Sequence, residues 1–231
     1  MMKKTEILLL AVLATALLGS CEDKSGTYAE QLYTNSEKNK TIYNCLDTCL
    51  DVAVNNLCKL NGYSQYDEGI YKIDFAPISY VLDTLSEHQQ GWLADSLVFF
   101  SNRMAESSGT VVRDAFSNAI NKLVVYDPDE LLDGNTALIT AYFKQMKYKD
   151  IEDAIAAPIA VRINVFDISY WLEEALRQYY SITNTPVSFD LQDYLTDRMM
   201  DGIFEEMSKE EILTRTDTLH RFTGSDLLNR D

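Results

Sequence analysis

The chain has 231 residues, enough for one sizeable domain or two small ones. Hydrophobic residues make up 46% and charged residues 24% of it, a composition that forms a buried core and excludes a disordered chain. The formal net charge of -16 argues against binding nucleic acid or an anionic membrane through bulk charge. His88 and His220 are the only histidines, which excludes most metal sites and histidine-based catalytic triads.

The N-terminus has the pattern of a bacterial lipoprotein leader. Two lysines precede an apolar segment, residues 7–18. This segment is too short for a membrane span, which takes about 20 residues, but it suits a signal-peptide core. It ends in Leu18-Gly19-Ser20-Cys21, which resembles the lipobox of bacterial lipoproteins. We predict a signal peptide over residues 1–20 and lipidation of Cys21; an ordinary signal peptide followed by a chance cysteine is the alternative.

The predicted leader also determines the predicted location. Removing residues 1–20 deletes two lysines and one glutamate, so the net charge becomes -17 and the acidic character belongs to the exported part. Acyl chains on Cys21 contribute about 0.8 kcal/mol of membrane attachment per buried methylene. We therefore predict a protein of the bacterial cell envelope, anchored to the outer membrane by lipid, with a polar tether over residues 21–41.

The remaining chain has the periodicity of helices. Ile42, Leu46, Leu50 and Val54 recur every four residues, as on one face of a helix. The segment 69–75 instead alternates apolar and polar residues, which indicates a short extended stretch. No second shift in composition or long linker follows. The pattern predicts an all-α fold, with a single multi-helix domain over residues 42–224 and a tail over residues 225–231.

One segment, residues 155–180, is apolar on two opposite helical faces. The first face carries Ile155, Ile159, Ile163, Phe166 and Tyr170, and the second carries Val161, Val165, Ile168, Leu172 and Leu176. A helix that is apolar on two faces is buried between neighbours. We therefore expect residues 155–180 to form a buried central helix around which the domain is built.

Cysteines and acidic residues offer two further candidate sites. Cys45 and Cys49 would stack one turn apart on a helix, a poor disulfide geometry, and Cys58 would lie too far away to pair. We interpret all three as small core residues, with a redox or metal role as the alternative.

Asp127-Pro128-Asp129-Glu130 has the pattern of a helix N-cap. A calcium-binding loop is the alternative, but the ligand spacing of an EF-hand is absent.

Near the C-terminus, acidic residues recur at helical spacing, and we call Asp190, Asp193, Asp197, Asp201 and Glu205 the carboxylate ladder. Steps of three and four place these acids on one side of a helix. They are candidates for binding a divalent cation or a cationic ligand, or for a carboxylate pair that hydrolyses a glycan. The alternative is a solvated helix face, with Asp190 as the N-cap and the early acids matching the helix dipole. Like charges one turn apart repel each other, which indicates that Arg198 or another helix faces the acids.

The C-terminal half contains the run from Phe189 to Asp197, followed by Asp201-Gly202-Ile203-Phe204. This run resembles the bacterial domain-of-unknown-function family 4197. Further matches are Leu132-Asp133-Gly134-Asn135-Thr136-Ala137, Asn102-Arg103-Met104-Ala105 and Arg215-Thr216-Asp217. The resemblance covers roughly residues 42–224 and implies a mostly helical, often exported or lipid-anchored protein. It implies no activity, so it transfers no catalytic residue.

These observations leave three functional hypotheses. The first is a lipid-anchored binding or interaction module of the envelope without catalytic activity, whose partner is an unknown envelope protein or a small ligand. The second is an envelope hydrolase that uses Asp or Glu residues, and the third is a structural scaffold without a small ligand. We expect no nucleic acid partner and no cofactor, apart from the divalent cation that the carboxylate ladder suggests.

Overall fold

The computed structural model describes residues 34–64 and 71–228 of the chain, and within these ranges every regular element is helical. The α-helices are α2 (Asn35–Leu57), α3 (Ser79–Glu87), α4 (Gly91–Glu106), α5 (Gly109–Asn121), α6 (Pro128–Leu132), α7 (Leu138–Val165), α8 (Ile168–Thr183) and α9 (Leu191–Thr216). Three short 3-10 turns accompany them, η1 (Ala76–Ile78), η2 (Thr218–His220) and η3 (Ser225–Leu228). The segment Thr34–Asp231 forms one compact unit, so the prediction of a single all-α domain is confirmed.

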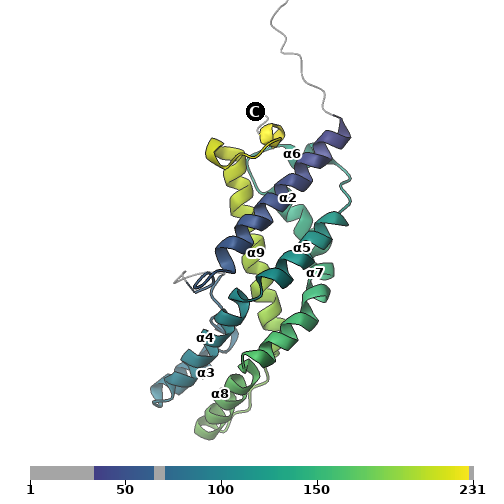
Figure 1. Ribbon diagram of the computed structural model, residues 1–231. Coiled ribbons are helices and arrows are strands. Elements are labelled where there is room, and N and C mark those ends of the chain that lie inside the picture. Colours follow the sequence, from purple (N-terminus) through teal and green to yellow (C-terminus); the bar gives the residue numbers. More distant parts are fainter. Residues whose placement is uncertain (1–33, 65–70, 229–231) are drawn as a thin grey trace, which may run out of the picture. The chain divides into compact units, whose positions relative to one another are not determined.

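The helices pack in two groups. In the first, α9 lies against α2 and α7, and α5 packs on the same two helices (Figure 1). Phe116 of α5, Phe143 of α7 and Phe204 of α9 meet there, with ring centroids 5.0 to 6.2 Å apart. In the second group, α3, α4 and α8 pack on one another. The domain therefore has an aromatic core in the first group and a smaller three-helix layer beside it.

The predicted central helix over residues 155–180 is wrong in extent and in burial. α7 ends at Val165, Asp167 adopts a left-handed backbone with φ of 54°, and α8 starts at Ile168 after a bend of 69°. One predicted face of α7 is buried, through Ile155, Ile159 and Ile163. On the other face Val161 and Val165 are 62% and 72% exposed. The second apolar stripe arises because α8 turns a new face toward α3 and α4, not because one helix is enclosed.

None of the described helices has, by itself, the length and hydropathy of a membrane span; α7 and α8 reach that hydropathy together, but only across their bend.

The predicted tether and tail need correction at the ends that adjoin the domain. α2 begins at Asn35, inside the predicted tether of residues 21–41, because Thr34 and Glu37 form a capping box. Ser225–Leu228 forms η3 with three buried residues, so this part of the predicted tail belongs to the domain.

The predicted extended stretch over residues 69–75 is described from residue 71 onward. Tyr71, Ile73 and Phe75 are buried, and the intervening side chains are more exposed, as the alternation predicts. In the part of the chain that the structure describes, the stretch pairs with no strand. The side chain of Asn102 makes the backbone hydrogen bonds that a neighbouring strand would make. Asn102 of α4 accepts a hydrogen bond from the backbone N–H of Ile73 (3.2 Å) and donates one to its carbonyl oxygen (2.9 Å).

The cysteine interpretation is confirmed for two residues. Cys45 and Cys49 of α2 are fully buried and free, with their Sγ atoms 3.9 Å apart. The hydrogen bond to Cys45 and burial raise the pKa of the Cys49 thiol well above its usual range. Cys58 is also free, but it is only partly buried and follows the end of α2. It therefore lies at the edge of the core instead of inside it.

A buried ion pair joins the ends of three helices. Glu211 and Arg215 of α9 lie 2.8 Å apart, and both side chains are fully buried. The Glu211 carboxylate accepts hydrogen bonds from the backbone N–H groups of Ile139 (3.0 Å) and Thr140 (2.7 Å), in the first turn of α7. The Arg215 guanidinium donates to the carbonyl oxygens at the end of α6, those of Leu131, Leu132 and Gly134. The pair therefore satisfies backbone groups that helix ends leave open.

We expect Arg215→Met to lower the free energy of unfolding by about 3–5 kcal/mol, because it leaves the Glu211 carboxylate buried without its partner. Urea denaturation followed by circular dichroism measures this loss. The matched control is Arg177→Met, which removes the surface pair between the exposed Arg177 and the half-buried Glu174 on α8 and should cost less than about 1 kcal/mol. Equal losses in the two variants would contradict a special role for the buried pair.

Candidate functional site

The carboxylate ladder lies along the N-terminal half of α9. Asp190 is the N-cap as predicted, and its carboxylate accepts a hydrogen bond from the backbone N–H of Asp193 (3.1 Å). Asp193 and Asp197 are exposed, and Asp201 is half-buried. The acids therefore share one helix and do not converge from different elements. A catalytic pair needs two carboxylates that face one substrate from different environments, and acids spaced along one helix face do not meet in this way.

Helix α7 faces the ladder. The Tyr148 hydroxyl donates a hydrogen bond to Asp197 (2.8 Å), and Lys144 forms an ion pair with Asp201 (2.9 Å). Burial and the bond to Asp197 raise the pKa of Tyr148. Arg198 turns away and donates to the carbonyl oxygen of Lys72 (2.8 Å). The expectation that another helix faces the acids is thus met by α7, and these two contacts assign Asp197 and Asp201 to interhelical packing.

Nowhere in residues 34–64 and 71–228 do three His, Cys, Asp or Glu side chains group closely enough to hold a metal ion. We therefore expect millimolar calcium to leave the melting temperature of the protein unchanged, because exposed carboxylates on one helix lack the converging oxygens that the ion requires. Thermal melts with and without calcium measure this. A rise in the wild type that is absent from the Asp193→Asn, Asp197→Asn double variant would restore the cation hypothesis.

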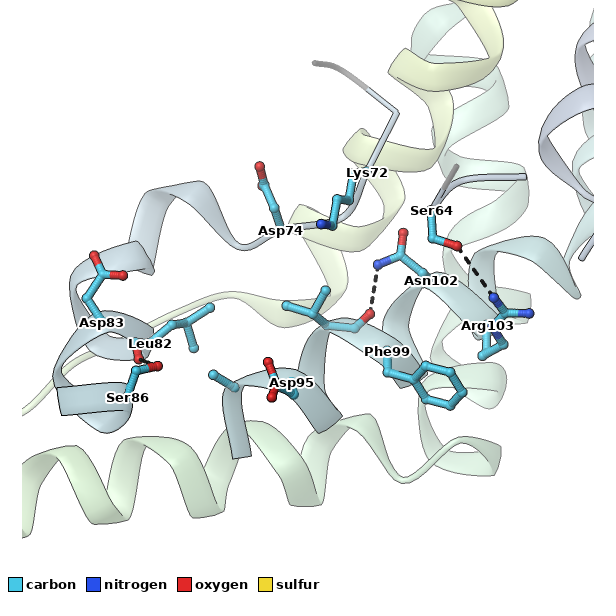
Figure 2. Close-up of a pocket in the computed structure, with 12 residues that line it drawn as sticks. Ser64, Lys72, Asp74, Leu82, Asp83, Ser86, Asp95, Phe99, Asn102 and Arg103 are labelled. Carbon is cyan, nitrogen blue, oxygen red and sulfur yellow. Dashed lines mark hydrogen bonds between the residues drawn. The ribbon is translucent and has the colours of Figure 1, made fainter. Parts of the chain in front are cut away.

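A hollow of about 440 Å³ lies between the stretch 71–75, α3 and α4, and we call it the polar cleft (Figure 2). Three carboxylates line it, those of Asp74, Asp83 and Asp95, together with Lys72. The buried Asn102 side chain forms part of its floor. Its carboxylates belong to three different elements, but basic side chains and Asn102 are interspersed with them.

Phe99 and Arg103 of α4 form one end of the polar cleft (Figure 2). The Arg103 guanidinium lies 5.4 Å from the centroid of the Phe99 ring and forms an ion pair with Glu106 (2.9 Å). It also donates to Asn61 and, at 3.4 Å, to Ser64. These bonds connect α4 to the turn after α2. Phe99 and Arg103 also line a second hollow, so these two side chains lie between the two hollows.

The second hollow is mainly apolar and has a volume of about 420 Å³. We call it the apolar pocket. Its lining residues come from the turn after α2, from α4 and from the α7–α8 junction: Cys58, Lys59, Leu60, Phe99, Phe100, Arg103, Glu106, Ser107 and Phe166. Leu60 is 77% exposed and Phe99 is 54% exposed, an unusual state for large apolar side chains that lie together.

Aromatic rings continue from the apolar pocket onto α8. Phe100 stacks on Trp171 at 5.5 Å with the ring planes 8° apart, and Trp92 meets Trp171 edge-on at 6.2 Å. Tyr170 contacts Trp171 as well. We call Trp92, Phe99, Phe100, Tyr170 and Trp171 the aromatic surface. It contains both tryptophans of the chain, so tryptophan fluorescence reports on this one region.

The polar groups of the apolar pocket include a thiol and a carboxylate whose pKa values are raised. Burial, reinforced by the nearby Glu106 carboxylate, raises the pKa of the Cys58 thiol to about 12, so the thiol is protonated and weakly nucleophilic at neutral pH. Burial also raises the pKa of Glu106, and the ion pair with Arg103 opposes this shift. Neither histidine lines either hollow.

The comparisons with known proteins concern the family alone. A family model described as "Protein of unknown function (DUF4197)" matches residues 32–230, which is nearly all of the compact unit. No curated protein and no solved structure matches the chain. The match therefore supports the resemblance read from the sequence and brings no residue with an assigned role.

Proposed function

From the premise that the chain belongs to the DUF4197 family of proteins of unknown function, we propose that it is a lipid-anchored binding module of the bacterial envelope without catalytic activity. The observation that carries the proposal is the apolar pocket, which opens between Leu60, α4 and the α7–α8 junction. Its volume of about 420 Å³ falls in the range of small-ligand sites. Apolar walls with a few charged groups at the edge are typical of such sites.

Two features of the described residues favour binding over hydrolysis or scaffolding. Asp197 and Asp201 of the ladder contact Tyr148 and Lys144 of α7, and the ladder acids lie along one helix instead of converging from different elements. Large apolar side chains are exposed together around one pocket, and such patches mark interaction sites on folded proteins. A pure scaffold gives no reason for a hollow beside them.

The proposal predicts that the apolar fluorophore N-phenyl-1-naphthylamine binds at this pocket, brightens, and quenches Trp92 and Trp171. The chain from residue 22 suits the titration, since it keeps the compact unit Thr34–Asp231 intact. Leu60→Asp should weaken binding about tenfold, because it places a charge where the ligand contacts an apolar wall. Leu60 is 77% exposed, so the substitution should leave the fold intact.

Leu219→Asp is the matched control, because Leu219 is 90% exposed on η2 and makes no part of either hollow. It should leave the affinity for the fluorophore unchanged. If both variants weakened binding equally, or if the wild type failed to bind the fluorophore, the binding proposal would be refuted.

The location in the proposal rests on the leader, which lies outside the described residues. Leu18-Gly19-Ser20-Cys21 supports lipidation, and a lipid anchor would hold a protein with a net charge of -17 at a membrane that its charge does not attract. Cys21 is the residue that would carry the lipid.

We expect Cys21→Ala to leave unprocessed precursor and to abolish labelling with radioactive palmitate in cells. Globomycin, which inhibits the lipoprotein signal peptidase, should make the wild-type precursor accumulate in the same way. Immunoblots of fractionated cells measure both effects. Normal processing of the Cys21→Ala variant would show that the leader is an ordinary signal peptide.

A further inference from the structure

We propose that the apolar pocket binds a single-chain anionic amphiphile, with the alkyl chain against Phe99, Phe100 and Phe166 and the anionic head beside Lys59. This inference rests on the proposed function, because it names the class of ligand that the same pocket takes. Three properties support the anionic amphiphile as the ligand: the charge at the edge of the pocket, the charge in the neighbouring cleft, and the hydrogen bonds that the polar lining already makes.

The edge of the apolar pocket is basic on an acidic protein. Lys59 is exposed and has no ion pair with any residue that the structure describes. Arg103 and Glu106 also line the pocket and neutralise each other at 2.9 Å. Arg162 of α7 donates to the lining residue Ser107 (3.1 Å). Arg162 and Asp167 both lie outside the lining, so their opposite charges offset each other and Lys59 supplies the net positive charge of the pocket. A local excess of positive charge on a chain with net charge -16 attracts anions to this edge.

The neighbouring polar cleft carries more acidic than basic side chains. Asp74, Asp83 and Asp95 line it together with Lys72 and Arg103 (Figure 2). The cleft shares Phe99 and Arg103 with the apolar pocket. An anionic head on that side would face three carboxylates and two basic side chains. Asp167, next to the lining residue Phe166, is exposed and outside the lining. The charges therefore orient an anionic ligand with its head away from the cleft and toward Lys59.

The polar atoms of the lining favour an alkyl chain over a peptide. A peptide brings backbone N–H and C=O groups that cost free energy when they are buried without partners. Two polar groups of the lining are already engaged: Glu106 is bound to Arg103, and the Ser107 hydroxyl accepts from Arg162 and donates to the carbonyl oxygen of Met104 (2.8 Å). The Nε atom of Arg103 is a donor that stays open, so the lining could meet few of the hydrogen bonds that a peptide backbone needs. An alkyl chain makes no such demand and buries its surface against the three phenylalanine rings.

Three surfactants of equal chain length test the proposal on the chain from residue 22, below their micelle concentrations. Dodecanoate carries the proposed negative head, dodecanol is neutral, and dodecyltrimethylammonium is positive. Fluorescence of Trp92 and Trp171 reports binding, because Trp171 stacks on Phe100 of the lining. We expect dodecanoate to bind at least fivefold more tightly than dodecyltrimethylammonium, with dodecanol between them, since one exposed charge contact is worth about that factor.

Lys59→Glu should weaken dodecanoate about fivefold, strengthen dodecyltrimethylammonium and leave dodecanol unchanged. The matched control is Lys40→Glu, the same charge change at another exposed position. It lies near the start of α2, about 25 Å along the helix from the turn that carries Lys59. Dodecanoate binding should be the same in this control as in the wild type, which separates a local contact from the net charge.

The outcomes separate this inference from the proposed function. Equal affinities for the three surfactants, or equal effects of Lys59→Glu and Lys40→Glu, would overturn the anionic head and leave the apolar pocket as a binding site. Failure of all three surfactants while N-phenyl-1-naphthylamine still binds would overturn the alkyl chain. Failure of every probe would remove the proposed function and this inference together.

Discussion

The buried pair of Glu211 and Arg215 is the interaction on which the arrangement of the long helices depends. Two charges out of water require full hydrogen bonding, and here the partners are the open N–H groups at the start of α7 and the open carbonyl groups at the end of α6. The negative charge lies at a helix N-terminus and the positive charge at a helix C-terminus, as helix dipoles favour. A shift of α9 by one turn would strand both charges, so the pair sets the register of α9 against α6 and α7.

This contact also gives physical meaning to two segments that carried the family resemblance. The segment from Leu132 to Ala137 supplies carbonyl oxygens to Arg215, and Arg215 opens the other matching segment. A third segment contains Gly202, where a Cβ would lie 3.2 Å from Cε1 of Tyr63 and 3.5 Å from Cδ1 of Leu57. The matching residues thus lie where helices meet closely, so the resemblance carries information on packing more than on chemistry.

The sequence could predict the helices and their caps, because periodicity and capping depend on residues a few positions apart. Asp127 and Asp190 cap α6 and α9 as expected, through hydrogen bonds to residues three positions later. The sequence could not predict that Glu211 is buried and binds the first turn of α7, because nothing in the local pattern distinguishes a buried acid from its exposed neighbours on α9. The carboxylate ladder was visible for the opposite reason: regular spacing on one face is a local pattern, and a solvated face produces it readily.

The apolar pocket and the aromatic surface escaped prediction because both depend on the break between α7 and α8. A continuous helix over residues 155–180 would carry Phe166 and Trp171 along one rod. The left-handed turn at Asp167 instead leaves Phe166 at the apolar pocket and directs α8 along α4, where Trp171 stacks on Phe100. Asp is one of the few residue types that adopt this backbone at modest cost. The left-handed backbone at Asp167 therefore converts a doubly apolar stretch, which looks like core, into two helices, the second of which forms the aromatic surface together with α4.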